Sequence, residues 1–128
     1  MVRRMGAIEA RRLGFDVMAN GERPNPLPIE WAEEAERLLK EQGWGNFEVV
    51  LIDGLCSYGD GEAIGSSLLG FYARDRSHDR FMGTAWHEAA HCLQHRYGMK
   101  EYPRPPLNNP GFMLGFNMAE VGAEDFRQ

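Results

Sequence analysis

The chain lacks the features that would mark a disulfide-rich, secreted or membrane-spanning protein. Its two cysteines, Cys56 and Cys92, have no metal-ligand spacing and form no disulfide framework. No apolar run approaches the roughly 20 residues that a bilayer-spanning helix needs, and no signal-peptide core follows the first residues. We therefore predict a cytoplasmic protein with no membrane partner, in which Cys92 is a small buried thiol.

The chain also lacks an excess of positive charge. Its formal net charge is -5 at pH 7, which argues against the phosphate backbone of a nucleic acid as the main partner. The N-terminal segment is locally basic because it carries Arg3, Arg4, Arg11 and Arg12. We interpret these arginines as a solvated helix face and predict no nucleic-acid partner.

Internal repeats and long low-complexity tracts are absent too. With 128 residues, of which 43% are hydrophobic, the chain is long enough for one compact domain and short for two. We predict a single domain over residues 1–128 with an α+β order of elements. The predicted elements are helices from Val2 to Leu13 and from Pro28 to a stop at Gly43, strands from Phe47 to Ile52 and from Leu68 to Ala73, and a long helix ending at Gly98.

The pentapeptide His87-Glu88-Ala89-Ala90-His91 is the most informative motif of the chain. An α-helix advances roughly 100° and 1.5 Å per residue, so side chains four positions apart share one face, one turn apart. Two imidazoles at this spacing can bind one metal ion, and the glutamate between them can reach a water molecule held by that ion. The motif therefore predicts a single Zn2+ ion with ligands His87 and His91, and Glu88 as the general base.

The residues around the motif favour a helix with one buried side. Apolar residues at helical spacing form a stripe that excludes both histidines; its members are Met82, Trp86, Ala89, Ala90, Leu93 and Tyr97. The alternative is a pair of ordinary surface histidines beside a solvated glutamate. A buried stripe opposite the histidines favours the metal site.

A catalytic zinc site typically has three protein ligands and one open position. The extended motif that would supply a third histidine is absent, because Gln94 and Tyr97 occupy its glycine and histidine positions. His95, one turn after His91, is one candidate, although three histidines in a row on one helix diverge as the helix turns. The other is a glutamate from a later helix, and residues 117–126 carry carboxylates on a stretch that can be helical.

The motif and the later run Glu120-Val121-Gly122-Ala123-Glu124 together resemble the gluzincins, zincin metallopeptidases that pair His-Glu-x-x-His with a downstream Glu-x-x-x-Asp. The resemblance implies that Glu120 is the third zinc ligand. It also implies that Glu124, or Asp125 in its place, accepts a hydrogen bond that orients a ligating histidine. The implied fold is a minimal zincin-like domain: N-terminal helices, a small mostly antiparallel sheet, the motif helix and a short C-terminal ligand helix.

These features predict a zinc-dependent metallopeptidase that hydrolyses peptide or protein substrates. One alternative is a latent or narrowly specific peptidase that needs a regulatory partner or a homo-oligomer. A second is a catalytically silent metal-binding module for interaction or regulation, and a third is a structural protein without metal.

Three further segments have open roles. Ser66 to Arg74 is either the cleft-edge strand that binds an extended peptide by strand addition, as in zincins, or a second core strand. The apolar run from Gly111 to Phe116 can line a pocket, bury against a second subunit or pack on the core, and we favour the core. The candidate donors for stabilising an oxyanion are Tyr72, Tyr97, Tyr102, His78 and Arg74.

Overall fold

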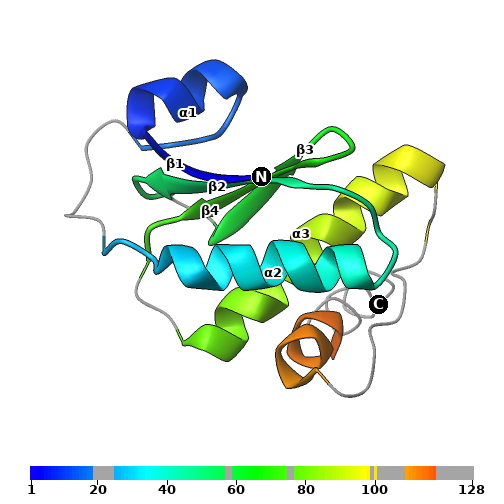
Figure 1. Ribbon diagram of the computed structural model, residues 1–128. Coiled ribbons are helices and arrows are strands. Elements are labelled where there is room, and N and C mark those ends of the chain that lie inside the picture. The colour runs from blue at the N-terminus through cyan, green and yellow to red at the C-terminus, as the bar shows by residue number, and fades with distance from the viewer. Residues whose placement is uncertain (19–24, 57–58, 75–76, 99, 101–108, 118–128) are drawn as a thin grey trace, which may run out of the picture.

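The computed structural model describes residues 1–18, 25–56, 59–74, 77–98, 100 and 109–117. In chain order its elements are β1 (Val2–Gly6), α1 (Ala7–Leu13), α2 (Ile29–Glu41), β2 (Glu48–Asp53), β3 (Gly61–Ile64), β4 (Leu68–Tyr72), α3 (His78–Tyr97) and a helical segment over residues 110–117 (Figure 1). They form an α+β fold, as the predicted order of elements requires. Within this described part of the chain, no helix is long and apolar enough to cross a membrane.

The four strands form one mixed sheet in the order β1-β2-β4-β3. β1 runs parallel to β2 and β2 runs parallel to β4, whereas β3 pairs antiparallel with β4. The prediction of a mostly antiparallel sheet is therefore wrong. Parallel neighbours need long connections, and the chain provides them because α1 and α2 separate β1 from β2, while β3 separates β2 from β4.

The prediction of one helix over Val2 to Leu13 is also wrong, because the start of that range forms β1. Met5 is buried in the sheet, and Arg3 reaches the neighbouring strand, where its Nε lies 3.1 Å from Glu48 Oε1. An edge strand that carries two adjacent arginines shows little apolar alternation, so its period is hidden in the sequence. The helix itself begins at Ala7 and ends before Gly14, whose φ of 107° closes it in the left-handed region.

The sequence analysis did not predict β3, which begins in a stretch rich in glycine, at Gly61. A turn at Gly65, with φ of 64°, folds β3 back onto β4. β3 thereby becomes the edge strand, and β4 lies between β2 and β3. Of the two roles considered for Ser66 to Arg74, the core strand is confirmed and the cleft-edge strand is wrong.

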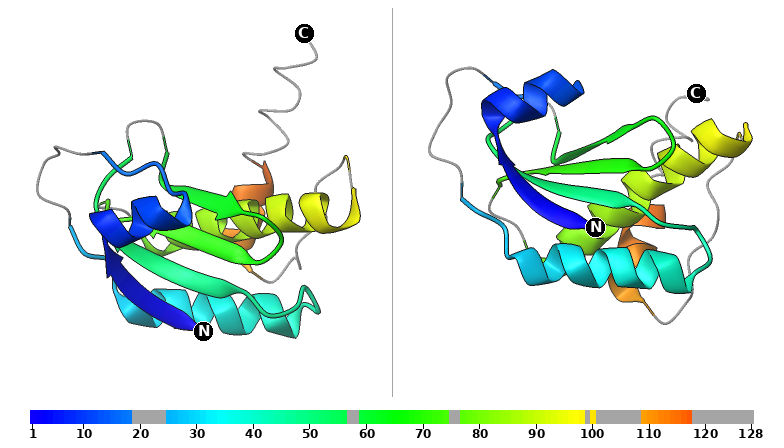
Figure 2. Two further views of the ribbon diagram at one scale, coloured as in Figure 1. Left: turned by 90° about the horizontal axis from the view of Figure 1, so that it is seen from above. Right: turned by 45° about the horizontal axis from the view of Figure 1, so that its top comes forward.

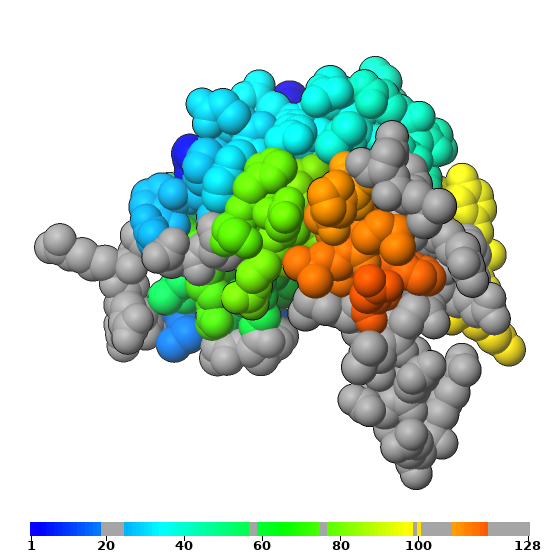
Figure 3. Space-filling model, turned by 90° about the horizontal axis from the view of Figure 1, so that it is seen from below, coloured from blue at the N-terminus to red at the C-terminus, as the bar shows by residue number. Residues whose placement is uncertain are grey.

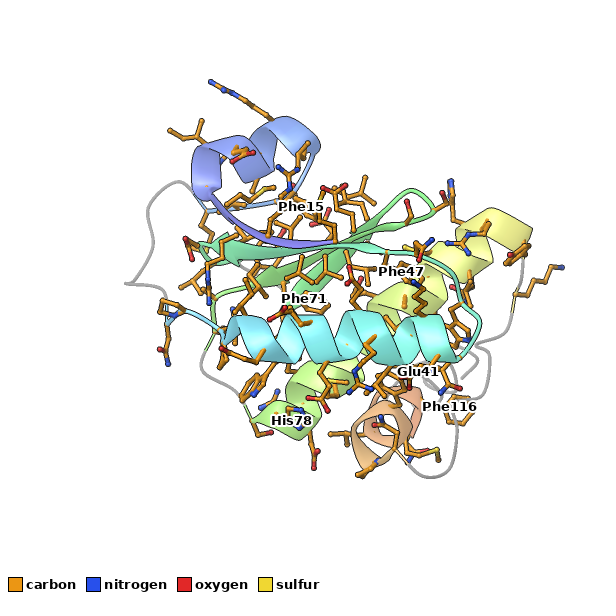
Figure 4. The ribbon with its side chains drawn as sticks, in the orientation of Figure 1. Phe15, Glu41, Phe47, Phe71, His78 and Phe116 are labelled. Atoms are coloured by element: carbon orange, nitrogen blue, oxygen red, sulfur yellow. The ribbon has the colours of Figure 1, made fainter. Side chains whose placement is uncertain are left out.

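The sheet separates two apolar clusters. α1 covers one face, where Phe15 and Tyr72 are buried, and α2 and α3 cover the other, where Phe71 and Trp86 are buried (Figures 1 and 2). Phe15 and Phe71 accordingly lie on opposite sides of the sheet (Figure 4). The larger cluster is the one beneath α2 and α3, so the motif helix rests on the main core.

The helical segment over residues 110–117 packs against the first half of α3 (Figure 3). The two helices meet at glycines, since a Cβ built on Gly115 would lie only 2.2 Å from the Gly83 carbonyl oxygen. Phe112 is fully buried, and the Phe116 ring meets the Trp86 ring edge-on with centroids 5.5 Å apart. Core packing of the run from Gly111 to Phe116 is therefore confirmed.

We predict that Gly115→Ala destabilises the protein, because the added methyl group cannot fit against the backbone of α3. Overpacking of this kind costs about 1–3 kcal/mol. Gly6→Ala is the matched control, since a Cβ there meets nothing within 4 Å. Urea unfolding of both variants measures the difference, and equal midpoints would show that the contact at Gly83 is not tight.

Candidate metal centre

α3 carries the residues of the predicted metal site, and contacts hold the helix in place at both ends. At its start the Ser77 hydroxyl accepts a hydrogen bond from the Arg80 backbone N–H, and at its end Gly98 adopts a φ of 64°. Near that end Arg96 donates to the Trp44 carbonyl at 2.8 Å and to the Ser66 carbonyl at 2.6 Å. Arg96 thus links the helix to the connection that precedes β2 and to the turn that precedes β4.

The predicted apolar stripe of α3 is buried, with one exception. Trp86, Ala89 and Ala90 are fully buried, whereas Tyr97 is 66% exposed and does not belong to the stripe. Cys92 is also buried, and burial raises the pKa of its thiol to about 11, so it is the inert thiol that the sequence predicts.

His87 and His91 direct their Nε2 atoms at the same point beside α3. These two atoms lie 3.1 Å apart, and the ring planes are inclined at 83°. Two nitrogens that bind one tetrahedral zinc ion at its usual bond length are separated by about 3.3 Å. The pair therefore already has nearly the separation that a shared metal ion requires.

Gln94 fixes the ring of His91. Its Oε1 lies 3.0 Å from His91 Nδ1, and an amide oxygen can only accept, so Nδ1 carries the hydrogen. The lone pair of His91 is then on Nε2, the atom that faces His87. When no ion is bound, His87 Nε2 donates to His91 Nε2, and a metal ion would replace that hydrogen.

The sequence analysis missed this role, because it took Gln94 only as the residue that breaks the extended motif. The signal was nevertheless present, since Gln94 stands three residues after His91 and side chains at that spacing meet on a helix.

Burial sets the charge state of His87. Burial is the larger cause and the charge of the neighbouring His91 the smaller one, and together they lower the pKa of His87 to about 4. His87 is therefore neutral at physiological pH. A neutral imidazole is the form that binds metal, so ion binding requires only that the hydrogen on Nε2 move to Nδ1, with no net release of a proton.

Glu88 is the third member of the group and lies between α3 and β3. One ligand atom from each of His87, Glu88 and His91 lies within 4.8 Å of the others. Burial raises the pKa of Glu88 to about 7, the charge of Glu62 adds to that rise, and the Ala63 backbone N–H opposes it by donating to the carboxylate. A carboxylate with a pKa near neutrality is suited to take and return a proton.

A cleft of about 430 Å³ opens beside this group. The start of β3 and the residues before it form one wall, α3 forms the floor, and the 110–117 segment forms the other wall. The residues that line the cleft are Gly59, Asp60, Gly61, Arg80, Gly83, Thr84, His87, Glu88, Leu114 and Gly115. The cleft therefore gives a ligand access to two of the three grouped side chains, His87 and Glu88.

The other residues predicted for the site fall into two sets. Glu120, Glu124, Asp125 and Tyr102 lie outside the described residues. His95 is exposed and does not join the group that His87, Glu88 and His91 form in the described part of the chain.

The described oxyanion candidates lie away from the histidine pair. Tyr72 is buried on the α1 side of the sheet and donates to Glu62 at 2.9 Å. His78 contacts Glu34 of α2 at 2.7 Å (Figure 4), and Tyr97 is exposed on the last turn of α3. Arg74 pairs with Asp60 at the rim of the cleft.

Comparison with known proteins adds no relative, since no protein-family model, curated protein or solved structure matches the chain. The geometry alone defines the class of site. His87, Glu88 and His91 form a half-buried group that could hold a metal ion.

We predict that Gln94→Ala weakens zinc binding about 10- to 100-fold, because loss of an outer hydrogen bond to a ligating histidine typically has that effect. Gln94→Glu should retain zinc binding, since its carboxylate can accept from the same Nδ1–H. His95→Ala is the control and should leave affinity unchanged. Titration against a chromophoric zinc chelator measures all three. Normal affinity in Gln94→Ala would contradict the orienting role, and a loss in His95→Ala would indicate that His95 is a ligand.

Proposed function

We propose that the protein is a zinc-dependent metallopeptidase. The observation that supports this most directly is the convergence of two histidine Nε2 atoms, 3.1 Å apart, beside a glutamate whose pKa is about 7. His87 and Glu88 line a cleft large enough for a peptide side chain and backbone. Imidazole and carboxylate donors suit Zn2+ among the divalent ions.

In this proposal His87 and His91 hold the ion, and Glu88 acts as general acid and base. The ion, when bound, lowers the pKa of a water molecule and polarises the substrate carbonyl. Glu88 takes a proton from the attacking water and gives it to the departing amine. Its raised pKa allows both steps near neutral pH, because the carboxylate holds the proton only briefly between them.

Glu120 remains the proposed third ligand. The 110–117 segment crosses α3 at Gly83, one turn before His87, and Gly115 of that segment lines the cleft. Glu120 follows the end of this segment by three residues. Because the 110–117 segment packs on α3 close to His87, we propose that the residues following it in the sequence supply the third ligand.

β3 offers an edge to which an extended peptide can pair. The Tyr72 N–H donates to the Asp60 carbonyl, so Asp60 and every second residue after it direct their backbone groups toward β4. Gly61 and Ala63 therefore direct theirs away from β4, on the side where the Ala63 N–H meets Glu88. We infer that a substrate strand pairs with Gly61 and Ala63 rather than with β4.

A latent form of the same enzyme is the second candidate, and one contact favours it. The carboxylate of Glu88 accepts from the Ala63 N–H, so the proposed base is engaged by the strand that would bind substrate. A partner or substrate that pairs with β3 would have to release it.

We predict that Glu88→Gln retains zinc and loses hydrolysis, since the amide cannot act as a base. The expected loss is about 10²- to 10⁴-fold in kcat. The assay uses unfolded and folded protein substrates, with and without a chelator, and zinc content is measured by elemental analysis. Retained hydrolysis in Glu88→Gln would exclude Glu88 as the base, and wild-type cleavage that survives the chelator would exclude the metal.

We further predict that Glu88→Gln raises the thermal stability of the metal-free protein at pH 8 but not at pH 4. The folded-state pKa of Glu88, about 7, lies above its ordinary value of 4.5. The folded protein therefore binds the proton more tightly, and this group makes stability fall as pH rises from about 4.5 to 7. Glutamine removes that cost, which should appear as a rise of a few degrees in Tm at pH 8. A Tm difference independent of pH would contradict the raised pKa.

A further inference from the structure

We propose that Arg80 is a specificity residue that binds a carboxylate of the substrate. This inference rests on the proposed peptidase function and names one class of substrate for it. The residue carrying it lies on the motif helix and lines the same cleft as Glu88. Four observations support it: the position of Arg80 on α3, its ion pairing, the volume of the cleft and the exposure of its side chain.

Arg80 lies on the same face of α3 as His87. Seven residues separate them, which is about two turns and about 10 Å along the axis. Between them Thr84 directs its methyl group toward Gly61 of β3, because a Cβ on Gly61 would meet that methyl at 2.9 Å. An extended peptide covers about 3.3 Å per residue, so Arg80 lies within about three residues of the scissile bond.

Arg80 forms only a long ion pair with the described residues around it. Asp60 is its nearest acidic partner, at 3.9 Å, the outer limit of an ion pair. Asp60 also pairs with Arg74, more closely at 3.4 Å. Asp60 thus faces two guanidinium groups and pairs more closely with Arg74 than with Arg80. A cationic substrate side chain would be repelled there, and an anionic one would be attracted.

The cleft leaves room for that anionic group. The cleft has a volume of about 430 Å³ and Arg80 lines it, so a carboxylate that enters the cleft can reach the guanidinium. Arg80 is 62% exposed, whereas Asp60 is 28% exposed, so the guanidinium is the more accessible of the two charged groups. Arginine is also the side chain best shaped to bind a carboxylate through two parallel hydrogen bonds.

Two sources could supply this carboxylate: an internal Asp or Glu side chain, or the free C-terminus of a short peptide. The probe is a set of decapeptides that differ only in Asp or Asn at successive positions, each made with a free and with an amidated C-terminus. Cleavage by the zinc-loaded protein is followed by mass spectrometry for the wild type, Arg80→Gln, Arg80→Glu and the control Arg37→Gln. Arg37 is exposed on α2 and pairs with Glu41 there, outside the cleft.

We expect the wild type to prefer one carboxylate position roughly tenfold in kcat/KM, the effect of a charge-assisted hydrogen bond at a partly exposed site. Arg80→Gln should abolish the preference, Arg80→Glu should invert it in favour of the Asn peptides, and Arg37→Gln should keep it. A preference that depends on the free C-terminus identifies the terminal carboxylate, and one that depends on Asp identifies the side chain. Equal cleavage of all peptides, or a preference that persists in Arg80→Gln, would overturn the inference.

A binding measurement separates this inference from the proposed function. Fluorescence anisotropy of the same labelled peptides on zinc-loaded Glu88→Gln protein needs no turnover. If the carboxylate peptides bind more tightly to Glu88→Gln, and the double variant Glu88→Gln/Arg80→Gln loses this difference, the subsite is supported even if no peptide is cleaved. Absence of any chelator-sensitive cleavage counts against the peptidase, whereas equal binding of Asp and Asn peptides counts against the subsite.

Discussion

The site depends on one constraint, which is that α3 has to bury one side completely while its other side presents two imidazoles a single turn apart. Trp86, Ala89 and Ala90 satisfy the first condition because they are fully buried against the main core. Their burial leaves no rotational freedom to the helix, so His87 and His91 are directed to the same side. The four-residue spacing and the contact with Gln94 determine the 3.1 Å separation of the two nitrogens, and apolar packing determines that the pair faces away from the core.

Burial acts on the chemistry as well as on the geometry. The same low-polarity surroundings that lower the pKa of His87 raise the pKa of Glu88, because both shifts disfavour the charged form. A ligand that is neutral and a base that is poised near neutral pH are what a hydrolytic metal centre needs. One physical cause therefore suits two residues of different type to the two tasks that we propose for them.

The sequence predicted α3 well because its signals are local. The apolar period, the stop at Gly98 and the spacing of His87 and His91 all lie within a few turns of one helix. It failed for β1, an edge strand whose partner lies more than forty residues away in the chain. The sheet type was wrong for another reason: the resemblance implied it, whereas the two predicted strands, β2 and β4, pair in parallel. The bond from the Ala63 N–H to Glu88 and the crossing of Gly83 with Gly115 were equally out of reach, because each joins segments that only the folded chain brings together.

The anchoring of Arg96 has a consequence for how the molecule can adapt. This side chain bonds to the carbonyls of Trp44 and Ser66 and lies over the Phe47 ring, 5.6 Å from its centre. The motif helix is thereby fastened to the sheet at one end, while the Ser77 cap and the contact of His78 with Glu34 secure the other. If the cleft has to widen for a bulky peptide, the movement must then come from the 110–117 segment or from the edge strand β3. We therefore expect α3 to stay in place while the two walls of the cleft adapt to the substrate.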